Sequence, residues 1–329
     1  MVLLQLDANN APDYLSRRGL AVRGPVQPLG GGVSNTVLLV ETDRGRVVLK
    51  QALGKLRVAA DWRSNPIRTL RECVALQQMA QLHEPGDVPF IHFLDRENLI
   101  YVMEAAPIVA RDWKTLLLGG DIDTGVAERI GALLAKQIRG TWKSAACQSE
   151  YGDQTVFDEL RLDPYYRYTA QQHPDLAPYY AHLIARCSTY ATSLVHGDWS
   201  PKNFLVAGGR PMVIDYEVVH FGDASFDAAF LLNHLLLKSL HRPEWRSRLA
   251  DAATAFWESL SSGLPADASW FAEGAKAHLG GLLLARIDGK SPAEYLHESV
   301  KPAARALARH LITAPPGGSP ADILENYQL

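Results

Sequence analysis

The sequence predicts an α+β protein in which a small sheet-forming lobe precedes a larger, mostly helical lobe. In the N-terminal third, short runs of β-branched and apolar residues alternate with turn signals, which is typical of strands. Beyond Pro107 the apolar residues recur at the spacing of amphipathic helices. The length of 329 residues suits two domains or one bilobal domain. We therefore expect an N-terminal lobe at 1–104, a helical lobe at 105–313 and a C-terminal tail at 314–329.

The composition argues against several classes of protein. Apolar residues make up 47% of the chain, a fraction typical of globular proteins rather than disordered ones. The net charge of −3 disfavours a nucleic-acid partner. The three cysteines are sparse and far apart, as expected in a reducing compartment. The most apolar stretch, 228–237, is too short for a membrane span, which needs about 20 residues. We expect a cytoplasmic protein without a membrane partner.

The N-terminal lobe is predicted to contain a five-stranded antiparallel sheet and one helix. The turn signal at 42–45 joins two of the strands into a hairpin. The helix is expected to begin with Asn65 as N-cap and Pro66 in its first turn, and to end at 83–86. The predicted strands cover 25–29, 33–40, 46–50, 90–94 and 98–103.

The C-terminal lobe is predicted to be helical apart from one short hairpin. Two apolar runs, 204–206 and 211–214, are separated by Gly208 and Gly209, which form a turn signal. The segment 314–320 is rich in Pro and Gly and is expected to be flexible. The predicted helices cover 126–143, 177–192, 225–240, 243–260 and 265–284.

The strongest functional signal lies on either side of this hairpin. His196, Asp198 and Asn203 have the spacing of a kinase catalytic loop, and Asp215 follows twelve residues after Asn203. Phosphoryl transfer needs Mg²⁺ held against the nucleotide phosphates and an acceptor hydroxyl held in line. Amide and carboxylate oxygens are ligands that Mg²⁺ accepts. The hairpin would return Asp215 to the corner occupied by the loop.

These motifs also resemble those of a known group of enzymes. His196-Gly197-Asp198 in place of His-Arg-Asp, with Ile-Asp215-x-Glu217 downstream, is similar to the aminoglycoside phosphotransferase, choline kinase and methylthioribose kinase superfamily. The sequence that starts at Lys50 resembles the N-lobe of methylthioribose kinases in particular. The resemblance covers most of the chain. It implies a bilobal protein-kinase-like fold and ATP-dependent transfer of the γ-phosphate to a hydroxyl of a small molecule, with Mg²⁺ as cofactor.

The resemblance implies roles for individual residues. Asp198 would orient the acceptor hydroxyl and take its proton, and Asn203 and Asp215 would hold Mg²⁺. Lys50 would reach the α- and β-phosphates of ATP, paired with a glutamate on the helix of the N-lobe. Glu72 is the candidate partner, although it could instead be solvated between neighbouring arginines. His196 is expected to have a structural role in the loop.

The nucleotide site is expected to include two backbone segments. Gly31, Gly32 and Ser34 would belong to the loop that covers the phosphates, since glycines let backbone N–H groups approach an anion. A glycine run can equally form a plain turn, but its position ahead of Lys50 favours the phosphate loop. Glu104 and Ala106 fall where the superfamily has its hinge, so their backbone groups are expected to bind adenine.

Four side chains are candidates for contact with the acceptor. Trp199 stands where many family members have an aliphatic residue, and Glu217 would serve either the metal or the substrate. Arg286 and Asp288 follow an apolar helix and are hypothesised to face the acceptor, or else to end that helix. The segment 151–180 combines six tyrosines with carboxylates, which suits a cationic ligand or packing between helices.

The nature of the acceptor stays open at this point. Asp215 and Asp227 are only twelve positions apart, which leaves little room to dock a peptide and favours a small hydroxylated acceptor. An aminoglycoside, an amino alcohol or a sugar such as methylthioribose would fit. Methylthioribose kinases often lack the residue equivalent to Asn203, which this chain has. The alternative to an enzyme is a non-catalytic, nucleotide-binding pseudokinase module. The sequence does not indicate an oligomeric state.

Overall fold

The computed structural model describes residues 4–30, 34–57 and 63–327, and the chain divides into two compact units. Unit 1 contains Met1–Ile108 together with Ile214–Val218, and unit 2 contains Val109–Val213 and Val219–Leu329. The division after Ile108 lies close to the expected boundary at 104. The return of Ile214–Val218 to unit 1 was not predicted, and it arises because Asp215 and Glu217 bind side chains of unit 1.

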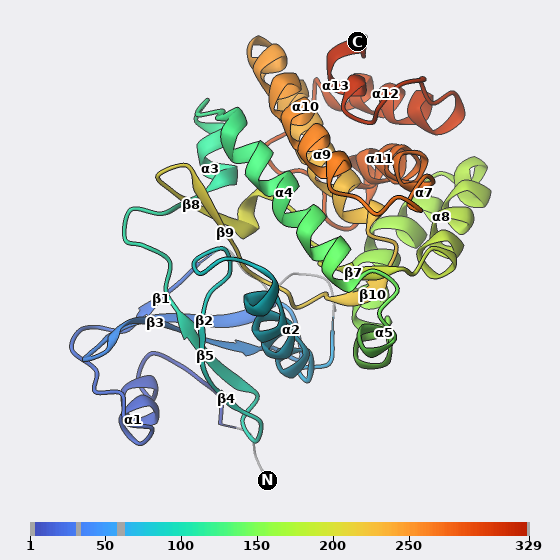
Figure 1. Cartoon of the computed structure of the whole chain (residues 1–329). Coiled ribbons are helices and arrows are strands. Elements are labelled where there is room, and N and C mark those ends of the chain that lie inside the picture. The colour runs from blue at the N-terminus through green and yellow to red at the C-terminus, as the bar shows by residue number, and fades with distance from the viewer. Residues whose placement is uncertain (1–3, 31–33, 58–62, 328–329) are drawn as a thin grey trace. The chain divides into compact units, whose positions relative to one another are not determined.

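Unit 1 is built on a five-stranded antiparallel sheet, which confirms the predicted architecture (Figure 1). The strand order is β1-β2-β3-β5-β4, so β3 lies at the centre. Lys50 on β3 is paired with Val37 on β2 and Tyr101 on β5. The strands are β1 (Gln27–Pro28), β2 (Asn35–Thr42), β3 (Gly45–Ala52), β4 (Ile91–Asp95) and β5 (Ile100–Glu104).

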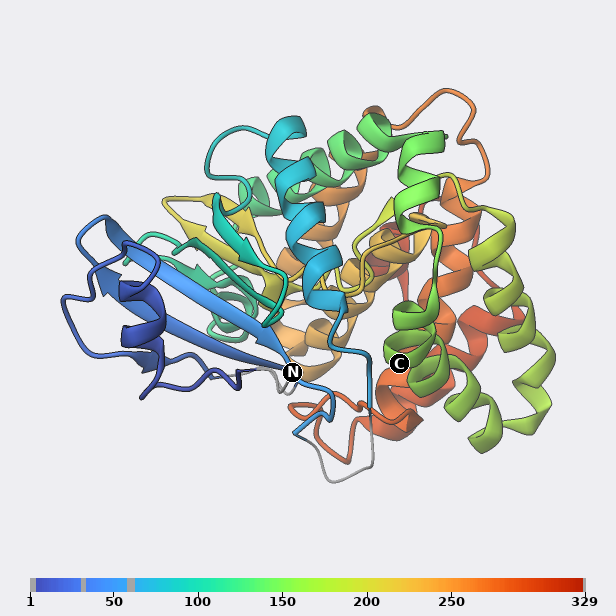
Figure 2. The same cartoon turned by 90° about the horizontal axis from the view of Figure 1, so that it is seen from below.

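Two helices pack on this sheet, whereas the sequence predicted one. The additional helix, α1 (Ala11–Ser16), places Tyr14 and Leu15 in an apolar cluster with residues of β2 and β5. Its six residues are too few to show a clear helical period. The predicted helix is α2 (Arg68–Leu82), which packs against β3, β4 and β5 (Figure 2). The predicted N-cap was wrong: the helix begins at Arg68 with Ile67 as its N-cap, and Asn65 lies in the preceding turn, where its Oδ1 accepts from the backbone N–H of Ile67 at 3.1 Å.

Unit 2 is mostly helical, as expected, and its core lies between long helices. Helices α4 and α10 pack closely, and α9 lies against both α10 and α11 (Figure 1). Gly131 allows the close approach of α4 and α10, because a Cβ there would lie 2.3 Å from the carbonyl oxygen of Phe256. The long helices are α4 (Thr124–Thr141), α8 (Ala177–Thr189), α9 (Ser225–His241), α10 (Arg246–Ser262), α11 (Phe271–Asp288) and α12 (Lys301–Thr313).

Short strands of unit 2 hold the loop that carries Asp198. The loop begins after β7 (Ser193–Val195), which pairs with β10 (His220–Gly222). It ends in a single turn of 3₁₀-helix, η3 (Pro201–Asn203). The chain then forms the predicted hairpin of β8 (Phe204–Ala207) and β9 (Arg210–Val213), with β6 (Arg111–Asp112) paired to β8.

Several helices of unit 2 were not predicted. The tyrosine-rich segment forms a chain of short helices that includes a π-helical stretch, η1 (Asp158–Arg167). Residues 314–327 do not form a bare tail, because α13 (Asp322–Asn326) buries Ile323 and Leu324 and packs on α9 and α10. Among the described residues, no helix is both long and apolar enough to span a membrane. The other short helices are α3 (Trp113–Leu118), α5 (Ala145–Tyr151), α6 (Thr155–Phe157) and α7 (Tyr168–Gln172).

Candidate active site

Lys50 and Glu72 form a buried ion pair in unit 1. Lys50 Nζ lies 2.7 Å from Glu72 Oε1 and also binds Asp215 Oδ1. The side chain of Glu72 is only 1% exposed, so Glu72 is not solvated beside its arginine neighbours. The structure therefore brings together three residues that were predicted from widely separated parts of the sequence.

The charges around Lys50 keep its ammonium protonated. Burial lowers the pKa of Lys50, but the carboxylates of Asp215 and Glu72 outweigh burial and hold that pKa above its ordinary value. Asp215 itself has a positive φ of 71°, a conformation that costs free energy for a residue with a side chain. Positively charged Lys50 and the oxygen ligands of Asp215 are suitable partners for a nucleotide phosphate and its cation.

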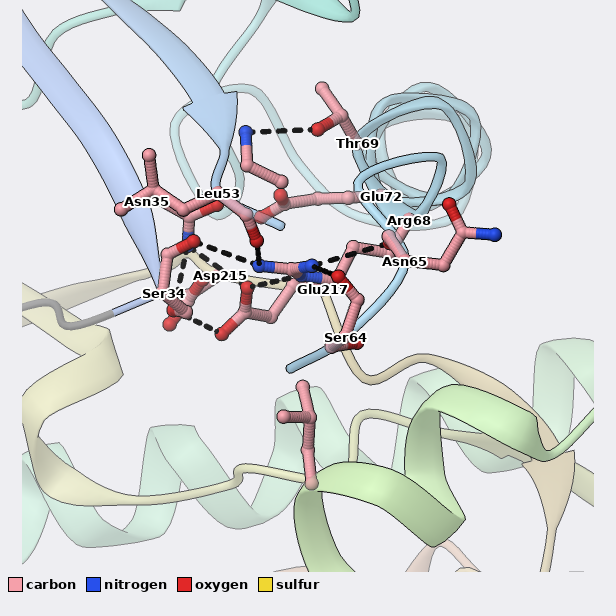
Figure 3. A network of polar contacts seen from close by, with 12 residues as sticks. Ser34, Asn35, Leu53, Ser64, Asn65, Arg68, Thr69, Glu72, Asp215 and Glu217 are labelled. Atoms are coloured by element: carbon pink, nitrogen blue, oxygen red, sulfur yellow. Dashed lines mark hydrogen bonds and ion pairs between the residues drawn. The ribbon is translucent and has the colours of Figure 1, made fainter. Parts of the chain in front are cut away.

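Glu217 belongs to a second polar network in unit 1, which Figure 3 shows. Its Oε1 accepts from Ser34 Oγ at 2.7 Å, and its Oε2 accepts from Asn35 Nδ2 at 2.9 Å. Arg68 Nε lies 3.2 Å from the same Oε2. Glu217 was expected to serve the metal or the substrate. The structure instead gives it three side-chain partners that tie the start of β2 to α2.

Arg68 is the centre of this network, and the sequence analysis did not single it out. Its side chain is fully buried and, among the described residues, it donates to Glu217 and otherwise only to backbone carbonyls. An arginine one helical turn before the paired Glu72 is the signal that could have found it. The carbonyl acceptors belong to Ser34, Leu53, Ser64 and Asn65.

Only part of the predicted nucleotide-binding backbone lies within the described residues. Gly31 and Gly32 lie outside the described residues, while Ser34 is held by Glu217 as above. Glu104 and Ala106 line a cavity of ≈ 420 Å³ at the end of β5. This volume falls within the range of small-molecule sites. The other lining residues are Arg44, Gly45, Arg46, Phe90, His92, Ala105, Pro107 and Ile108.

Asp198 in unit 2 is buried between two cations. Its Oδ2 lies 3.0 Å from Arg161 Nη2 and 2.9 Å from Lys202 Nζ. Burial raises the pKa of Asp198, but Lys202 and Arg161 lower it more, so this pKa is held well below its usual range. Asp198 is therefore a carboxylate at neutral pH. A carboxylate can accept a hydrogen bond from a hydroxyl and so fix the direction of that hydroxyl.

The loop around Asp198 is braced from α9. Asp227 accepts from the backbone N–H of His196 at 2.6 Å and of Gly197 at 2.9 Å. His196 is fully buried, and its Nδ1 accepts from the backbone N–H of Asp198 at 3.1 Å. Gly197 has a φ of +77°, which glycine adopts without a steric penalty. His196 thus lies in a supporting position, and the carboxylate is presented by a rigid turn.

Asn203 and Asp215 were predicted to hold Mg²⁺, and their chemistry fits that ion. Asn203 Nδ2 donates to the carbonyl oxygen of Asp198 at 2.9 Å, which turns the amide oxygen away from that carbonyl. An amide oxygen and a carboxylate are hard ligands of the kind that Mg²⁺ uses alongside phosphate oxygens and water. The two residues belong to different units, Asn203 to unit 2 and Asp215 to unit 1.

Two of the predicted acceptor-contacting residues have other partners. Trp199 is fully buried, with its ring 5.0 Å from that of Phe204, so it supports the loop from inside. Asp288 accepts two hydrogen bonds of 2.7 Å from Arg305 on α12 and lies 2.8 Å from His173 Nε2. These contacts tie α11 to its neighbours and occupy both oxygens of the carboxylate. Asp288 therefore belongs to an ion-pair cluster between helices.

Arg286 and Arg161 both lie near the ring of Tyr165 in the tyrosine-rich segment. Arg286 Nη1 lies 3.4 Å from Tyr165 Oη and donates to Ser291 Oγ at 2.7 Å. The sequence analysis gave Arg161 no role. Three of the five carboxylates of the segment pair with the chain's own cations, which argues against a cationic ligand there: Asp158 with Arg167, Asp163 with Lys290, and Asp175 with Arg309.

This arrangement of a buried lysine–glutamate pair and a braced Asp198 loop agrees with the comparison with known families. Residues 25–270 match the family described as "Phosphotransferase enzyme family". The chain belongs to this family. The match covers the described parts of the sheet of unit 1, the Asp198 loop and most of the helices of unit 2.

Curated relatives of this phosphotransferase include methylthioribose kinases. The chain is 26% identical over 279 residues to methylthioribose kinase from Escherichia coli O45:K1, covering 73% of this chain and 66% of the relative. It is 27% identical over 243 residues to methylthioribose kinase 2 from Oryza sativa subsp. japonica, covering 64% and 56%. The chain thus spans less than two thirds of the length of these relatives.

Solved structures show the same kinase-like fold. An aminoglycoside phosphotransferase from Alicyclobacillus acidocaldarius has a TM-score of 0.53 at 16% identity, covering 98% of this chain and 97% of that one. A choline/ethanolamine kinase family protein from Mesorhizobium loti has a TM-score of 0.52 at 15% identity, covering 96% of both chains. The predicted α+β, protein-kinase-like fold is therefore confirmed.

Proposed function

We propose that this chain is an ATP-dependent O-phosphotransferase that transfers the γ-phosphate of ATP to a hydroxyl of a small molecule, with Mg²⁺ as cofactor. The observation that carries the proposal is the contact of Lys50 Nζ with both Glu72 and Asp215. A lysine held in this way between a helix glutamate and a metal-binding aspartate is the phosphate-binding arrangement of kinases. Family membership supports the same reaction.

Each polar side chain has a defined part in the proposed reaction. Lys50 binds the α- and β-phosphates, and its buried partner Glu72 fixes the direction of its side chain. Asn203 and Asp215 would hold Mg²⁺, which would supply positive charge to the phosphate oxygens. Asp198 orients the acceptor hydroxyl and receives its proton. Because Arg161 and Lys202 keep the pKa of Asp198 low, it is a weak base that positions the hydroxyl and takes the proton late.

The acceptor is proposed to be a small molecule. Only eleven residues separate Asp215 from Asp227, and five of them belong to β10 and the start of α9. This leaves no long segment on which a peptide could dock. The relatives named as methylthioribose kinases make a hydroxylated sugar a candidate class. The non-catalytic alternative gains no support from relatives whose names are those of kinases.

The proposal is tested by acceptor-dependent ADP release from Mg-ATP. The panel contains methylthioribose, other sugars, amino alcohols, hydroxy acids and aminoglycosides, each assayed with wild type and Asp198→Asn. Asp267→Asn is the matched control, because Asp267 is an exposed carboxylate of unit 2 that pairs with Lys143. We expect one class of acceptor to stimulate wild type and the control, and Asp198→Asn to lose about 10³-fold or more in kcat.

Three results would contradict this proposal. Equal ADP release by wild type and Asp198→Asn would remove Asp198 from the reaction. Binding of Mg-ATP, measured by calorimetry, without turnover on any acceptor would favour the nucleotide-binding module. A protein that fails to bind Mg-ATP at all would be neither an enzyme of this kind nor such a module.

A further inference from the structure

Cationic side chains gather beside Asp198 in unit 2, and the reaction proposed above does not use most of them. We call Arg161, Lys238 and Arg286 the cationic cluster. His234 lies among them as a neutral side chain, because burial holds its pKa well below the ordinary histidine value. Arg161 comes from the π-helical stretch η1, His234 and Lys238 from α9, and Arg286 from α11. π-Helical turns often occur at functional sites, because they displace side chains from the regular helical spacing.

Aromatic rings connect the members of the cationic cluster to one another. The Tyr165 ring centre lies 5.8 Å from Arg161 Cζ and 6.0 Å from Arg286 Cζ. The Phe230 ring centre lies 5.7 Å from Arg161 Cζ and 5.3 Å from the ring centre of His234. Arg161 itself binds Asp198. The cluster therefore extends from Asp198 across one continuous set of neighbouring side chains.

Lys238 lies at the far end of this set. It is 1% exposed, and its Nζ lies 5.3 Å from the ring centre of Tyr295 and donates to the carbonyl of His234 at 3.2 Å. The pKa of Lys238 is lowered to about 7, chiefly by burial and also by the charges of Lys114 and Arg286. Asp112 acts in the opposite direction. A cation in this environment is stabilised when an anion binds beside it.

The positive charges of Arg286 and Lys238 are not matched by carboxylates. Arg161, in contrast, binds Asp198, as Lys202 does. Within the described part of the chain, neither Arg286 nor Lys238 has a carboxylate within 4.0 Å. Buried charges without a counter-ion are unfavourable.

Unsatisfied polar atoms accompany these unmatched charges. Arg286 Nε and Tyr295 Oη are both buried and, among the described residues, have no hydrogen-bond partner. Both atoms can donate a hydrogen bond. Donors without hydrogen-bond partners and cations without counter-ions, next to the proposed catalytic carboxylate, are the features expected of a site for an anionic group.

We propose that the phosphate acceptor carries a negatively charged group, a carboxylate or a phosphate, which binds Arg286 and Lys238 while its hydroxyl lies at Asp198. The inference rests on the proposed function and narrows its substrate class. The hydroxyl oxygen forms a bond to the γ-phosphorus, the bond from that phosphorus to the β-γ bridging oxygen breaks, ADP leaves, and the hydroxyl proton passes to Asp198. Polycationic acceptors such as aminoglycosides are disfavoured, because the cluster would repel them.

Matched pairs of acceptors test this inference directly. The pairs are D-gluconate with D-glucose, D-glycerate with glycerol, and sn-glycerol 3-phosphate with glycerol, so that carboxylate and phosphate are tested separately. Methylthioribose, choline and kanamycin represent neutral and cationic acceptors. Turnover of Mg-ATP and acceptor binding by calorimetry are both measured. We expect an anionic compound to bind, and its kcat/KM to exceed that of its neutral partner at least tenfold.

Variants connect this preference to the cluster. Arg286→Gln and Lys238→Met should each raise the KM for the anionic acceptor at least tenfold and weaken its calorimetric binding. The controls are Arg309→Gln, an exposed arginine that pairs with Asp175, and Lys276→Met, a buried lysine that pairs with Glu273. Both controls should bind and turn over the acceptor as wild type does.

The outcomes separate this inference from the proposed function. Asp198-dependent turnover that prefers a neutral or cationic acceptor would overturn the inference and leave the phosphotransferase intact. Absence of binding by every anionic compound, or binding unaffected by Arg286→Gln and Lys238→Met, would also overturn it. Anion binding through both residues without any phosphate transfer would overturn the phosphotransferase and the acceptor assignment that depends on it.

Discussion

Arg161 Nη2 lies 3.0 Å from Asp198 Oδ2, and the same guanidinium donates from Nε to the carbonyl of Gly197 at 2.6 Å. Arg161 therefore fixes both the side chain of Asp198 and the backbone that precedes it. A carboxylate held at two points has little freedom to rotate away from an acceptor hydroxyl. The π-helical stretch that carries Arg161 is thus part of the support of the catalytic loop.

Replacing Arg161 by methionine should lower kcat about 10²-fold, which is comparable with the loss of one preorganised charged donor. The pKa of Asp198 should rise because one of its two cations is removed. The acidic limb of the pH–kcat profile should then move to higher pH, a change that mere loss of packing would not cause. Arg309→Met serves as the control. An unchanged pH profile together with an unchanged kcat would contradict this role.

Replacing Lys50 by methionine should separate stability from activity. The variant leaves the carboxylates of Glu72 and Asp215 without their cation, which should lower the free energy of unfolding by about 3 kcal/mol. The double variant Lys50→Met/Glu72→Gln removes one of the orphaned charges and should recover part of that loss in urea unfolding. Activity on Mg-ATP should stay at least 10²-fold below wild type in both. Recovery of activity along with stability would show that Lys50 has only a structural role.

Lys238 should make the stability of the protein depend on pH. Its pKa is about 7 when folded and about 10.4 in an unfolded chain, so between these values the unfolded state binds more protons. The free energy of unfolding should therefore rise from pH 7 to pH 10. The charged groups acting on Lys238 are Lys114, Arg286 and Asp112, with His234 one turn away on α9.

The Lys238→Met variant lacks the buried ammonium group and its unfavourable burial. At pH 7 it should be more stable than wild type by on the order of 3 kcal/mol. The slope between pH 7 and pH 10 should become shallower than in wild type, as measured by urea unfolding at each pH. Lys276→Met, which removes a buried lysine with its own carboxylate, should leave the slope unchanged. A Lys238→Met variant that is less stable than wild type at pH 7 would disprove the assignment.

Gly131→Ala should destabilise unit 2 through the contact of two helices. The added Cβ would lie 2.3 Å from the carbonyl oxygen of Phe256, so α4 and α10 must move apart. We expect a loss of about 1–3 kcal/mol in the free energy of unfolding, measured with urea. At Gly317 a Cβ would meet nothing within 4 Å, so Gly317→Ala is the control. Equal stability of the two variants would mean that the helices accommodate the methyl group freely.

The sequence by itself determined the parts of this protein that depend on local spacing. The five strands, the longest helices and the hairpin between Asn203 and Asp215 follow from patterns a few residues long, and the structure contains all of them. The motif around Asp198 also identified the family, because phosphoryl transfer constrains residue types at short, fixed separations. The short helices were missed, since six residues such as those of α1 cannot define a period. The longer helix α12 (Lys301–Thr313) was missed as well.

Only the tertiary structure decided which side chains meet across long stretches of chain. Arg68 reaches Glu217, Arg161 reaches Asp198, and Asp288 is bound by Arg305 instead of facing an acceptor. No local pattern encodes these pairings, because they depend on how helices and strands pack. The same holds for Lys238 and Arg286, which have ordinary positions in the sequence. Their lack of counter-ions becomes evident only when folding buries Lys238 and half-buries Arg286.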